Sequence, residues 1–263
     1  MDIISSKDNE IIKNIKKLKD KKYRDLNNEF IVEGIKIIGE AIQENARIKK
    51  VVVCEECVAD GSINQKLLYG IAKYDCVYVT KKVFDSITDV SNPQGILAVI
   101  EKKNLEDDID FSQDLIIALD GVQDPGNLGT ILRTIDSANI KQIIVSKNTA
   151  DSYNPKVVRS TMGATFRVKV IECEDLAATL KNMKKHKFKI MSTSLNTENS
   201  IYDVNYNKKV IVIGNEANGV SQEILDLSDE KIKIPMLGKT ESLNASVATG
   251  IIVYEYVRQK ICK

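Results

Sequence analysis

Three segments in the second half of this 263-residue chain share one pattern, which constrains the fold more than any other feature of the sequence. In each, an apolar run typical of a buried strand leads into a loop rich in Gly and Asn, and a helix-like segment follows. The segments start at Leu115, Val210 and Lys231. In open α/β sheets, ligands bind at the loops that follow the carboxyl ends of the strands. We therefore predict an α/β fold with a binding site built from these three loops.

The rest of the chain also alternates between strand-like and helix-like segments, which favours α/β layers with largely parallel sheets. A charged stretch without apolar periodicity, at residues 102–113, separates the two halves. We predict two domains, residues 1–105 and 106–263. Expected strands are 29–34, 48–56, 76–80, 95–103, 114–121, 142–146, 166–172, 188–194, 208–215 and 231–236, and expected helices include 35–45, 63–74, 81–87 and a last one from Asn244.

Composition narrows the cellular setting of the protein. No apolar run approaches the roughly 18 residues that would span a bilayer, and the N-terminus lacks a basic segment followed by an apolar one. The five cysteines are scattered and odd in number, unlike a disulfide framework. We expect a cytoplasmic protein with no membrane partner.

Positive charge is concentrated in only one segment. Lys and Arg together number 38 against 37 Asp and Glu, so the overall charge gives no sign of nucleic acid. Residues 13–24, however, contain seven basic side chains and a single acid, Asp20, in what reads as one helix. This segment is either a solvated helix face or a surface that contacts phosphates. The RNA-binding candidates are Lys16, Lys17, Lys21, Lys22 and Arg24.

Several common site chemistries are excluded by the sequence. His186 is the one histidine and is expected to be exposed, so a Ser-His-Asp triad or a histidine metal site is not expected. Cys54 and Cys57 have zinc-like spacing, but nothing completes four ligands, and we expect no metal. The segment 238–240 (Gly-Lys-Thr) resembles the end of a P-loop, but Lys233 stands where the first glycine is required.

The first loop holds a tight turn followed by a helix. Residues 124–127 (Asp-Pro-Gly-Asn) make the turn, Asn127 can cap the helix, and Gly129 and Arg133 lie in its first turns. A capped helix with a surface arginine would explain these residues equally well.

The second and third loops carry further polar groups. Gly214 and Gly219 bracket a loop in which Glu216 offers a carboxylate, and the glycines let backbone approach a ligand closely. Around the start of the last helix stand three polar residues, which serve either as caps or as contacts to a polar ligand: Ser242, Asn244 and Ser246.

The order and spacing of these residues resemble the three motifs of the SpoU/TrmH family of RNA ribose 2′-O-methyltransferases. The motifs are Asn-x-Gly with Arg four residues later, Gly-Asn-Glu-x-x-Gly, and Ile-Pro-Met with Ser-Leu-Asn-x-Ser, and all are present within residues 113–263. On residues 29–42 and 92–103, the first domain resembles more weakly the substrate-binding domain of ribosomal-RNA members of the family.

The resemblance implies a fold and an assembly. The C-terminal domain is expected to form a trefoil knot, preceded by a smaller ribosomal-protein-like α/β domain that grips RNA. The methyl donor is S-adenosylmethionine, no metal is required, and the enzyme is a homodimer with a shared catalytic pocket. Four apolar residues at helical spacing could pack in the dimer interface or within one chain: Val247, Ile251, Tyr254 and Val257.

The resemblance also implies roles for individual residues. The cofactor-binding candidates are Gly214, Ile234, Leu243, Thr193, Met236 and Ser246. The catalytic candidates are Asn127, Arg133, Glu216, Asn244 and Ser242. Because arginine keeps its proton under nearly all conditions, we expect Arg133 to clamp a phosphate and stabilise negative charge on the 2′-oxygen rather than act as a base.

Other functions stay open at this point. The extra N-terminal domain favours 23S ribosomal RNA as substrate, with transfer RNA as the alternative. A catalytically silent RNA-binding member and a phosphotransferase using residues 238–240 are the competing hypotheses.

Overall fold

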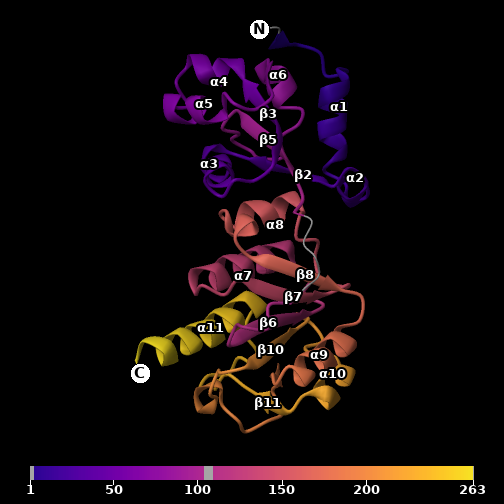
Figure 1. The fold of residues 1–263 in the computed structure, drawn as a ribbon, viewed down its shortest axis with the longest axis vertical. Coiled ribbons are helices and arrows are strands. Elements are labelled where there is room, and N and C mark those ends of the chain that lie inside the picture. The colour runs from indigo at the N-terminus through magenta and orange to yellow at the C-terminus, as the bar shows by residue number, and fades with distance from the viewer. Residues whose placement is uncertain (1–2, 104–108, 263) are drawn as a thin grey trace. The chain divides into compact units, whose positions relative to one another are not determined.

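The computed structural model describes residues 3–103 and 109–262, so the predicted domain boundary at 105/106 lies outside the described residues. By packing, the chain divides into two compact units (Figure 1). The first comprises Met1–Asn104 and Tyr153–Phe166, and the second comprises Leu105–Ser152 and Arg167–Lys263. The predicted boundary puts residues 153–166 in the second domain, but the side chains of this segment, the excursion Tyr153–Phe166, pack into the first unit.

The first unit contains a five-stranded mixed sheet in the order β1-β4-β3-β5-β2. β1, β4 and β3 run parallel, whereas β5 is antiparallel to both of its neighbours, β3 and β2. Because β2 is antiparallel to β5, it runs in the same direction as β1, β4 and β3, so the sheet is largely parallel as predicted, with β5 as the exception. Apolar periodicity marks a strand without indicating its direction, and it could not single out β5. The strands are β1 (Ile3–Ile4), β2 (Glu29–Glu33), β3 (Ile48–Cys54), β4 (Cys76–Val79) and β5 (Ile96–Glu101).

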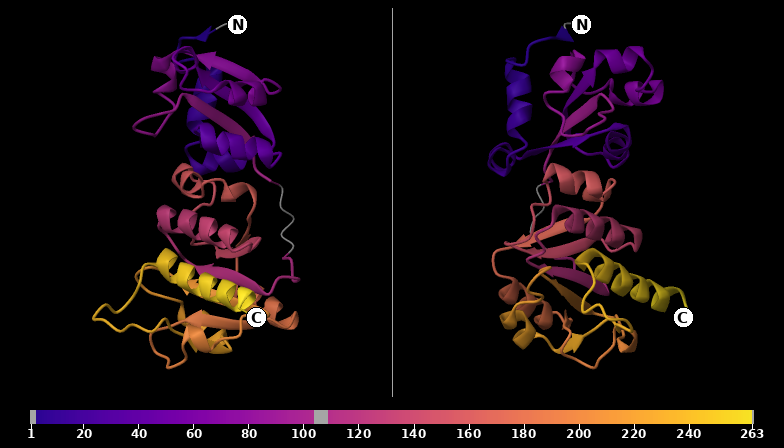
Figure 2. Two further views of the ribbon diagram at one scale, coloured as in Figure 1. Left: turned by 90° about the vertical axis from the view of Figure 1, so that its left-hand side faces the viewer. Right: turned by 180° about the vertical axis from the view of Figure 1, so that it is seen from behind.

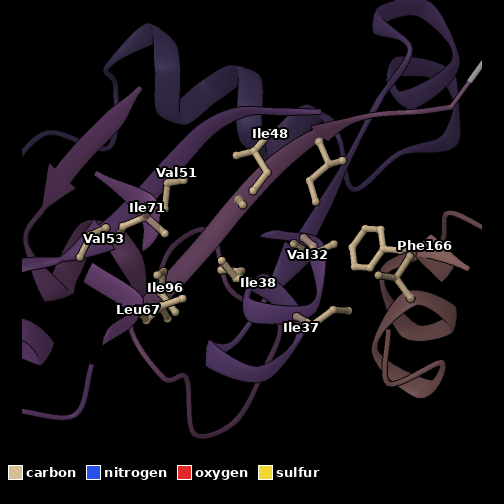
Figure 3. Packing of buried hydrophobic residues seen from close by; sticks show 14 of the residues in the cluster. Val32, Ile37, Ile38, Ile48, Val51, Val53, Leu67, Ile71, Ile96 and Phe166 are labelled. Atoms are coloured by element: carbon tan, nitrogen blue, oxygen red, sulfur yellow. The ribbon is translucent and has the colours of Figure 1, made fainter. Parts of the chain in front are cut away.

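Helices cover both faces of this sheet. On one face, α1 and α6 bury Ile12, Ile15 and Phe84. On the other, α3 and α5 bury Ile38 and Leu67, and the excursion adds Val158 and Phe166 to the same core (Figure 3). The helices of this unit are α1 (Glu10–Lys17), α2 (Lys21–Asn27), α3 (Ile35–Gln43), α4 (Glu55–Ala59), α5 (Gln65–Ile71), α6 (Lys81–Phe84) and α8 (Pro155–Ser160), followed by the 3-10 turn Ala164–Phe166.

The basic segment folds as two helices, α1 and α2, and not as one. Asp20 caps α2, because its carboxylate accepts a hydrogen bond of 2.9 Å from the Lys22 N–H. Arg24 is only 2% exposed, and its guanidinium donates to the carbonyl oxygens of Leu18 at 2.9 Å and Lys19 at 2.7 Å. The prediction that Arg24 contacts RNA is therefore wrong: its donors close the corner between the two helices.

The second unit is built on a six-stranded sheet in the order β11-β9-β10-β6-β7-β8. Every pair in it is parallel, as predicted. The central strands are buried on both faces and so read as continuous apolar runs. The strands are β6 (Leu115–Asp120), β7 (Gln142–Ser146), β8 (Lys169–Cys173), β9 (Lys189–Thr193), β10 (Lys209–Gly214) and β11 (Glu230–Ile232).

Two pairs of helices enclose this sheet. α9 (Leu176–Lys185) and α10 (Gln222–Leu227) pack on one face, against alternate residues of the strands that include Ala118 and Val212. α7 (Pro125–Ser137) and α11 (Ala245–Ile261) lie side by side on the other face (Figure 2). No helix in the described ranges has the length and hydropathy needed to cross a bilayer.

The strand order places the three motif loops at one edge of the sheet. After β6 the chain proceeds outward through β7 and β8 on one side, whereas β10, β9 and β11 lie on the other. Asp120 and Gly214, the last residues of β6 and β10, are directly paired. This reversal of strand order is the position where open α/β sheets bind ligands.

Candidate active site

The first motif is held by a helix cap at Asp124, not at Asn127 as predicted. The carboxylate of Asp124 accepts a hydrogen bond of 2.9 Å from the Asn127 N–H, and Pro125 occupies the first helical position of α7. Asn127 was expected to be this cap. Instead it lies in the first helical turn, 8% exposed, and its side-chain amide is available for other partners.

The second motif is a tight hairpin that requires glycine at its base. A Cβ added to Gly214 would lie 2.0 Å from the carbonyl carbon of Gly219, so no other residue fits there without moving backbone. Asn215 and Gly219 exchange two backbone hydrogen bonds of 2.9 Å across the hairpin. The Asn215 side chain then donates to the Gly121 carbonyl at 2.8 Å, which ties this hairpin to the first motif loop.

Glu216 stands at the tip of the hairpin and accepts three hydrogen bonds from the first motif. The Asn127 side-chain amide donates at 2.8 Å, and the backbone N–H groups of Gln123 and Asp124 each donate at 3.2 Å. Partial burial alone would raise the pKa of Glu216, but these hydrogen bonds outweigh it and lower the pKa below its ordinary value. Glu216 is therefore a carboxylate at neutral pH.

The third motif joins the same network through Asn244. Its side-chain oxygen caps α11 by accepting from the N–H groups of Ser246 at 2.9 Å and Val247 at 3.3 Å, and it also accepts from the Ser246 hydroxyl at 2.7 Å. Its side-chain amide donates to the Asn127 side-chain oxygen at 2.9 Å. The predicted cap is confirmed, and the same side chain reaches the first motif.

These contacts form one directional chain of hydrogen bonds, from α11 through Asn244 and Asn127 to Glu216. Since an ionised carboxylate only accepts, Asn127 must present its amide group to Glu216 and its oxygen to Asn244. Asn244 must then direct its own oxygen toward the start of α11. Each member thus fixes the orientation of the next, although Asn127 is separated in sequence from Glu216 by 89 residues and from Asn244 by 117.

Arg133 and Ser242 stand apart from this network. Arg133 is exposed on α7, and within residues 3–103 and 109–262 no acceptor bonds its guanidinium. Ser242 is exposed in the loop before α11 and likewise makes no hydrogen bond to the described residues. The structure therefore brings together Asn127, Glu216 and Asn244, and leaves Arg133 with all its donors available for a ligand.

The cofactor-binding candidates lie along the ends of β9, β10 and β11. Thr193 ends β9, where its hydroxyl donates to the Val212 carbonyl at 3.1 Å, and Gly214 ends β10. Ile234, Met236 and Leu243 are half-buried in the segment between β11 and α11. Ser246, also half-buried, is held by Asn244.

Two residues of this edge were not proposed as site residues from the sequence. Asp120, at the end of β6, accepts a hydrogen bond of 2.8 Å from the Ser221 N–H, and Asn215 bonds Gly121 as described above. Their signal in the sequence is a polar side chain at the end of a buried strand or directly after it. Both hold the two loops together at their bases.

The remaining motif-like segments make no comparable site. Cys54 is buried at the end of β3 and Cys57 is half-buried in α4, and burial raises the pKa of Cys54 to about 12. Among the described residues, no three His, Cys, Asp or Glu side chains cluster as metal ligands. Residues 238–240 are exposed in the segment between β11 and α11.

Comparison with known proteins decides the family. The sequence pattern of the SpoU rRNA Methylase family matches residues 114–254, more than half of the chain, and that of the MRM3-like substrate binding domain matches residues 9–98. The chain belongs to the SpoU rRNA methylase family. Both resemblances found in the sequence are thereby confirmed.

Relatives in this family match the chain over nearly its whole length. It is 31% identical to the 23S rRNA (guanosine(2553)-2′-O)-methyltransferase RlmP of Bacillus subtilis, over 95% of this chain and 97% of that protein. It is 34% identical to the 23S rRNA (guanosine-2′-O-)-methyltransferase RlmB of Xylella fastidiosa, over 89% of this chain and 97% of that protein. The AdoMet-bound rRNA methyltransferase of Sinorhizobium meliloti superimposes with a TM-score of 0.86 at 29% identity, covering 98% of both chains. The α/β fold class is confirmed by this superposition.

Proposed function

We propose that this protein transfers a methyl group from S-adenosylmethionine to a ribose 2′-hydroxyl of RNA, with 23S ribosomal RNA as the substrate. The observation that carries the proposal is the hydrogen-bonded union of Asn127, Glu216 and Asn244, one residue from each family motif, at the ligand-binding edge of the sheet. The choice of 23S RNA rests on the relatives RlmP and RlmB, which match both units of the chain.

The residues at the ends of β9, β10 and β11 fit the cofactor. The half-buried apolar side chains Ile234, Met236 and Leu243 suit an adenine ring, and the hydroxyl of Thr193 suits a polar part of the molecule. Gly214, where a Cβ has no room, lies at the end of β10 at the base of a tight hairpin. When bound, the sulfonium supplies both the methyl group and its leaving group.

The chain's own residues then have two tasks, alignment and charge stabilisation. A ribose hydroxyl is a poor nucleophile, so it must be held in line with the methyl group. The exposed, unbonded guanidinium of Arg133 can grip the adjacent phosphate through two parallel hydrogen bonds and stabilise negative charge on the 2′-oxygen. Glu216, kept ionised by its three donors, orients Asn127 and Asn244 around the nucleotide.

The assembly proposed is a knotted homodimer in the cytoplasm. Val247 and Tyr254 on α11 are 50% and 53% exposed, and a second copy of α11 would cover them, whereas Ile251 and Val257 are half-buried within this chain. In the first unit, the exposed lysines of α1 and α2 support binding to the RNA phosphates.

The proposal is tested by incubating the purified protein with S-adenosylmethionine carrying a labelled methyl group and RNA from cells that lack the gene. We expect label in 23S RNA, at a nucleotide resistant to cleavage on its 3′ side, because a 2′-O-methyl group blocks alkaline hydrolysis. If label appeared only in transfer RNA, the substrate would be transfer RNA and not 23S RNA. Binding of RNA without transfer of label would indicate a catalytically silent member and refute the proposal.

A further inference from the structure

The corner between α1 and α2 carries positive charge that the protein does not neutralise. Residues 9–28 contain seven basic and three acidic residues. Lys13 and Lys19 each pair with a carboxylate, and Arg24 is buried against backbone carbonyls. Four lysines remain that no carboxylate in the described part of the chain pairs: Lys16, Lys17, Lys21 and Lys22.

An aromatic ring lies among these lysines. The Nζ of Lys17, at the end of α1, lies 5.9 Å from the ring centroid of Tyr23, and the Nζ of Lys22 lies 5.8 Å from it. The Tyr23 ring is half-buried, and Arg24 beside it fixes the corner. The two lysines approach the ring on flexible stems and are attracted by its electron-rich face.

A single-stranded nucleotide offers the complement to both features. Proteins that bind unpaired RNA stack its bases on aromatic side chains and contact its phosphates with basic ones. We propose that Tyr23 is a stacking platform for one unpaired RNA base and that Lys17 and Lys22 bind the phosphates on either side of this base. The inference rests on RNA being the substrate, and it assigns one side chain to base contact within a surface otherwise expected to bind phosphates alone.

The same unit contains a matched tyrosine in a different electrostatic setting. Tyr69 is 79% exposed on α5, on the opposite face of the sheet from α1 (Figure 1). Residues 35–76, which include α5, carry six basic and six acidic side chains, so this surface has no net attraction for phosphates. Tyr69→Leu therefore serves as the control for Tyr23→Leu.

The test uses the full chain and two labelled RNAs of about 12 nucleotides, a length within the range that single-strand binding sites cover. One is oligo(A), and the other has the same ribose and phosphate groups without bases. We expect Tyr23→Leu to weaken oligo(A) binding by roughly 5- to 100-fold and to leave binding of the abasic RNA unchanged. Tyr23→Phe should bind both RNAs like the wild type, because it keeps the ring.

The lysine variants give an independent readout. Lys17→Ala and Lys22→Ala should weaken binding of both RNAs and reduce the dependence of affinity on salt, because each removes a phosphate contact. The thermal melting curve of Tyr23→Leu should match that of the wild type, which separates loss of stacking from loss of fold.

Any of three results would refute the stacking role of Tyr23. These are unchanged oligo(A) affinity in Tyr23→Leu, an equal loss of affinity for the abasic RNA in Tyr23→Leu, or an equal loss of oligo(A) affinity in Tyr69→Leu. The methyl-transfer assay distinguishes this failure from failure of the proposed function. A protein that methylates RNA but is insensitive to Tyr23→Leu refutes only the platform. If the protein binds oligo(A) through Tyr23 but transfers no methyl group, only the proposed enzymatic activity is refuted.

Discussion

Replacing Glu216 by Gln tests the directional network most sharply, because the change keeps the shape of the side chain and reverses part of its hydrogen bonding. The two oxygens of Glu216 accept from the Asn127 amide and from two backbone N–H groups. One oxygen accepts from both the Asn127 amide and the Asp124 N–H, whereas the other accepts only from the Gln123 N–H, so a glutamine directs its own NH₂ group toward the Gln123 N–H. A buried donor left without an acceptor costs about 1–3 kcal/mol, and because Glu216 is exposed to solvent we expect a loss at the lower end of this range, about 1 kcal/mol. For a chain of this size we expect a fall in Tm of about 2–4 °C.

Activity should fall further than stability. Asn127 then donates to a neutral amide oxygen in place of a carboxylate, which weakens the hydrogen bond that fixes its orientation, and a misplaced catalytic group can cost about 100-fold in rate. We therefore expect kcat/KM for methyl transfer to fall by about 100-fold in Glu216→Gln. Glu223→Gln, which removes an exposed carboxylate from α10 in the same unit, is the matched control and should change neither quantity measurably.

A second substitution, at Asn127, tests whether Asn127 and Glu216 orient one another. Asn127→Asp alone places a second carboxylate against Glu216 and should destabilise the protein, whereas Asn127→Asp combined with Glu216→Gln restores one carboxylate facing one amide. The double variant should therefore be more stable than Asn127→Asp by about 1–2 kcal/mol, measured by urea denaturation in a double-mutant cycle. If the two substitutions add with no coupling, the side chains do not orient one another and the reasoning is wrong.

The pH dependence of the same contact has a defined sign. Because the folded-state pKa of Glu216 lies below its ordinary value of 4.5, the unfolded chain binds a proton more readily than the folded one. The stabilisation by Glu216 is thus fully present above pH 4.5 and is lost as the pH falls through the lower, folded-state pKa. The Tm difference between wild type and Glu216→Gln should therefore shrink on acidification below pH 4.5, and a difference that grows would contradict this assignment.

Three further substitutions probe other parts of the structure. Arg133→Lys should lower kcat for methyl transfer by about 100-fold or more with little change in Tm, since the side chain is exposed and unbonded; near-full turnover would refute the phosphate clamp. Gly214→Ala should abolish S-adenosylmethionine binding in calorimetry and lower Tm, because a Cβ there meets backbone at 2.0 Å; wild-type affinity would show that the hairpin can shift. Phe166→Ala should destabilise the first unit by about 3–5 kcal/mol in urea, because the ring is 4% exposed in the core of that unit; no change would show that the excursion Tyr153–Phe166 adds nothing to it.

The sequence was most informative where local pattern and burial coincide. The strands of the second unit were predictable because parallel strands buried on both faces read as unbroken apolar runs. Asn244 was predictable as a cap because a short polar side chain directly precedes the long final helix. The three loops were recognisable because Gly and Asn concentrate at strand ends, where ligand sites lie.

Features that depend on tertiary context could not be predicted. Asp124 and Asn127 are both good capping residues, and only the helix start at Pro125 decides between them. Arg24 reads like the lysines around it, but in the fold it points inward to the carbonyls of Leu18 and Lys19. The excursion Tyr153–Phe166 follows the same alternation as its surroundings, so the pattern does not reveal which unit it packs against.

The central claim is that three distant loops form one site that methylates a ribose of ribosomal RNA. Mapping 2′-O-methyl groups in the 23S RNA of cells with and without the gene tests it most directly, with complementation by the wild type and by Glu216→Gln. We predict that one methylated ribose disappears when the gene is deleted, returns with the wild type, and returns little or not at all with Glu216→Gln. An identical set of methylated riboses in all four strains would contradict the account.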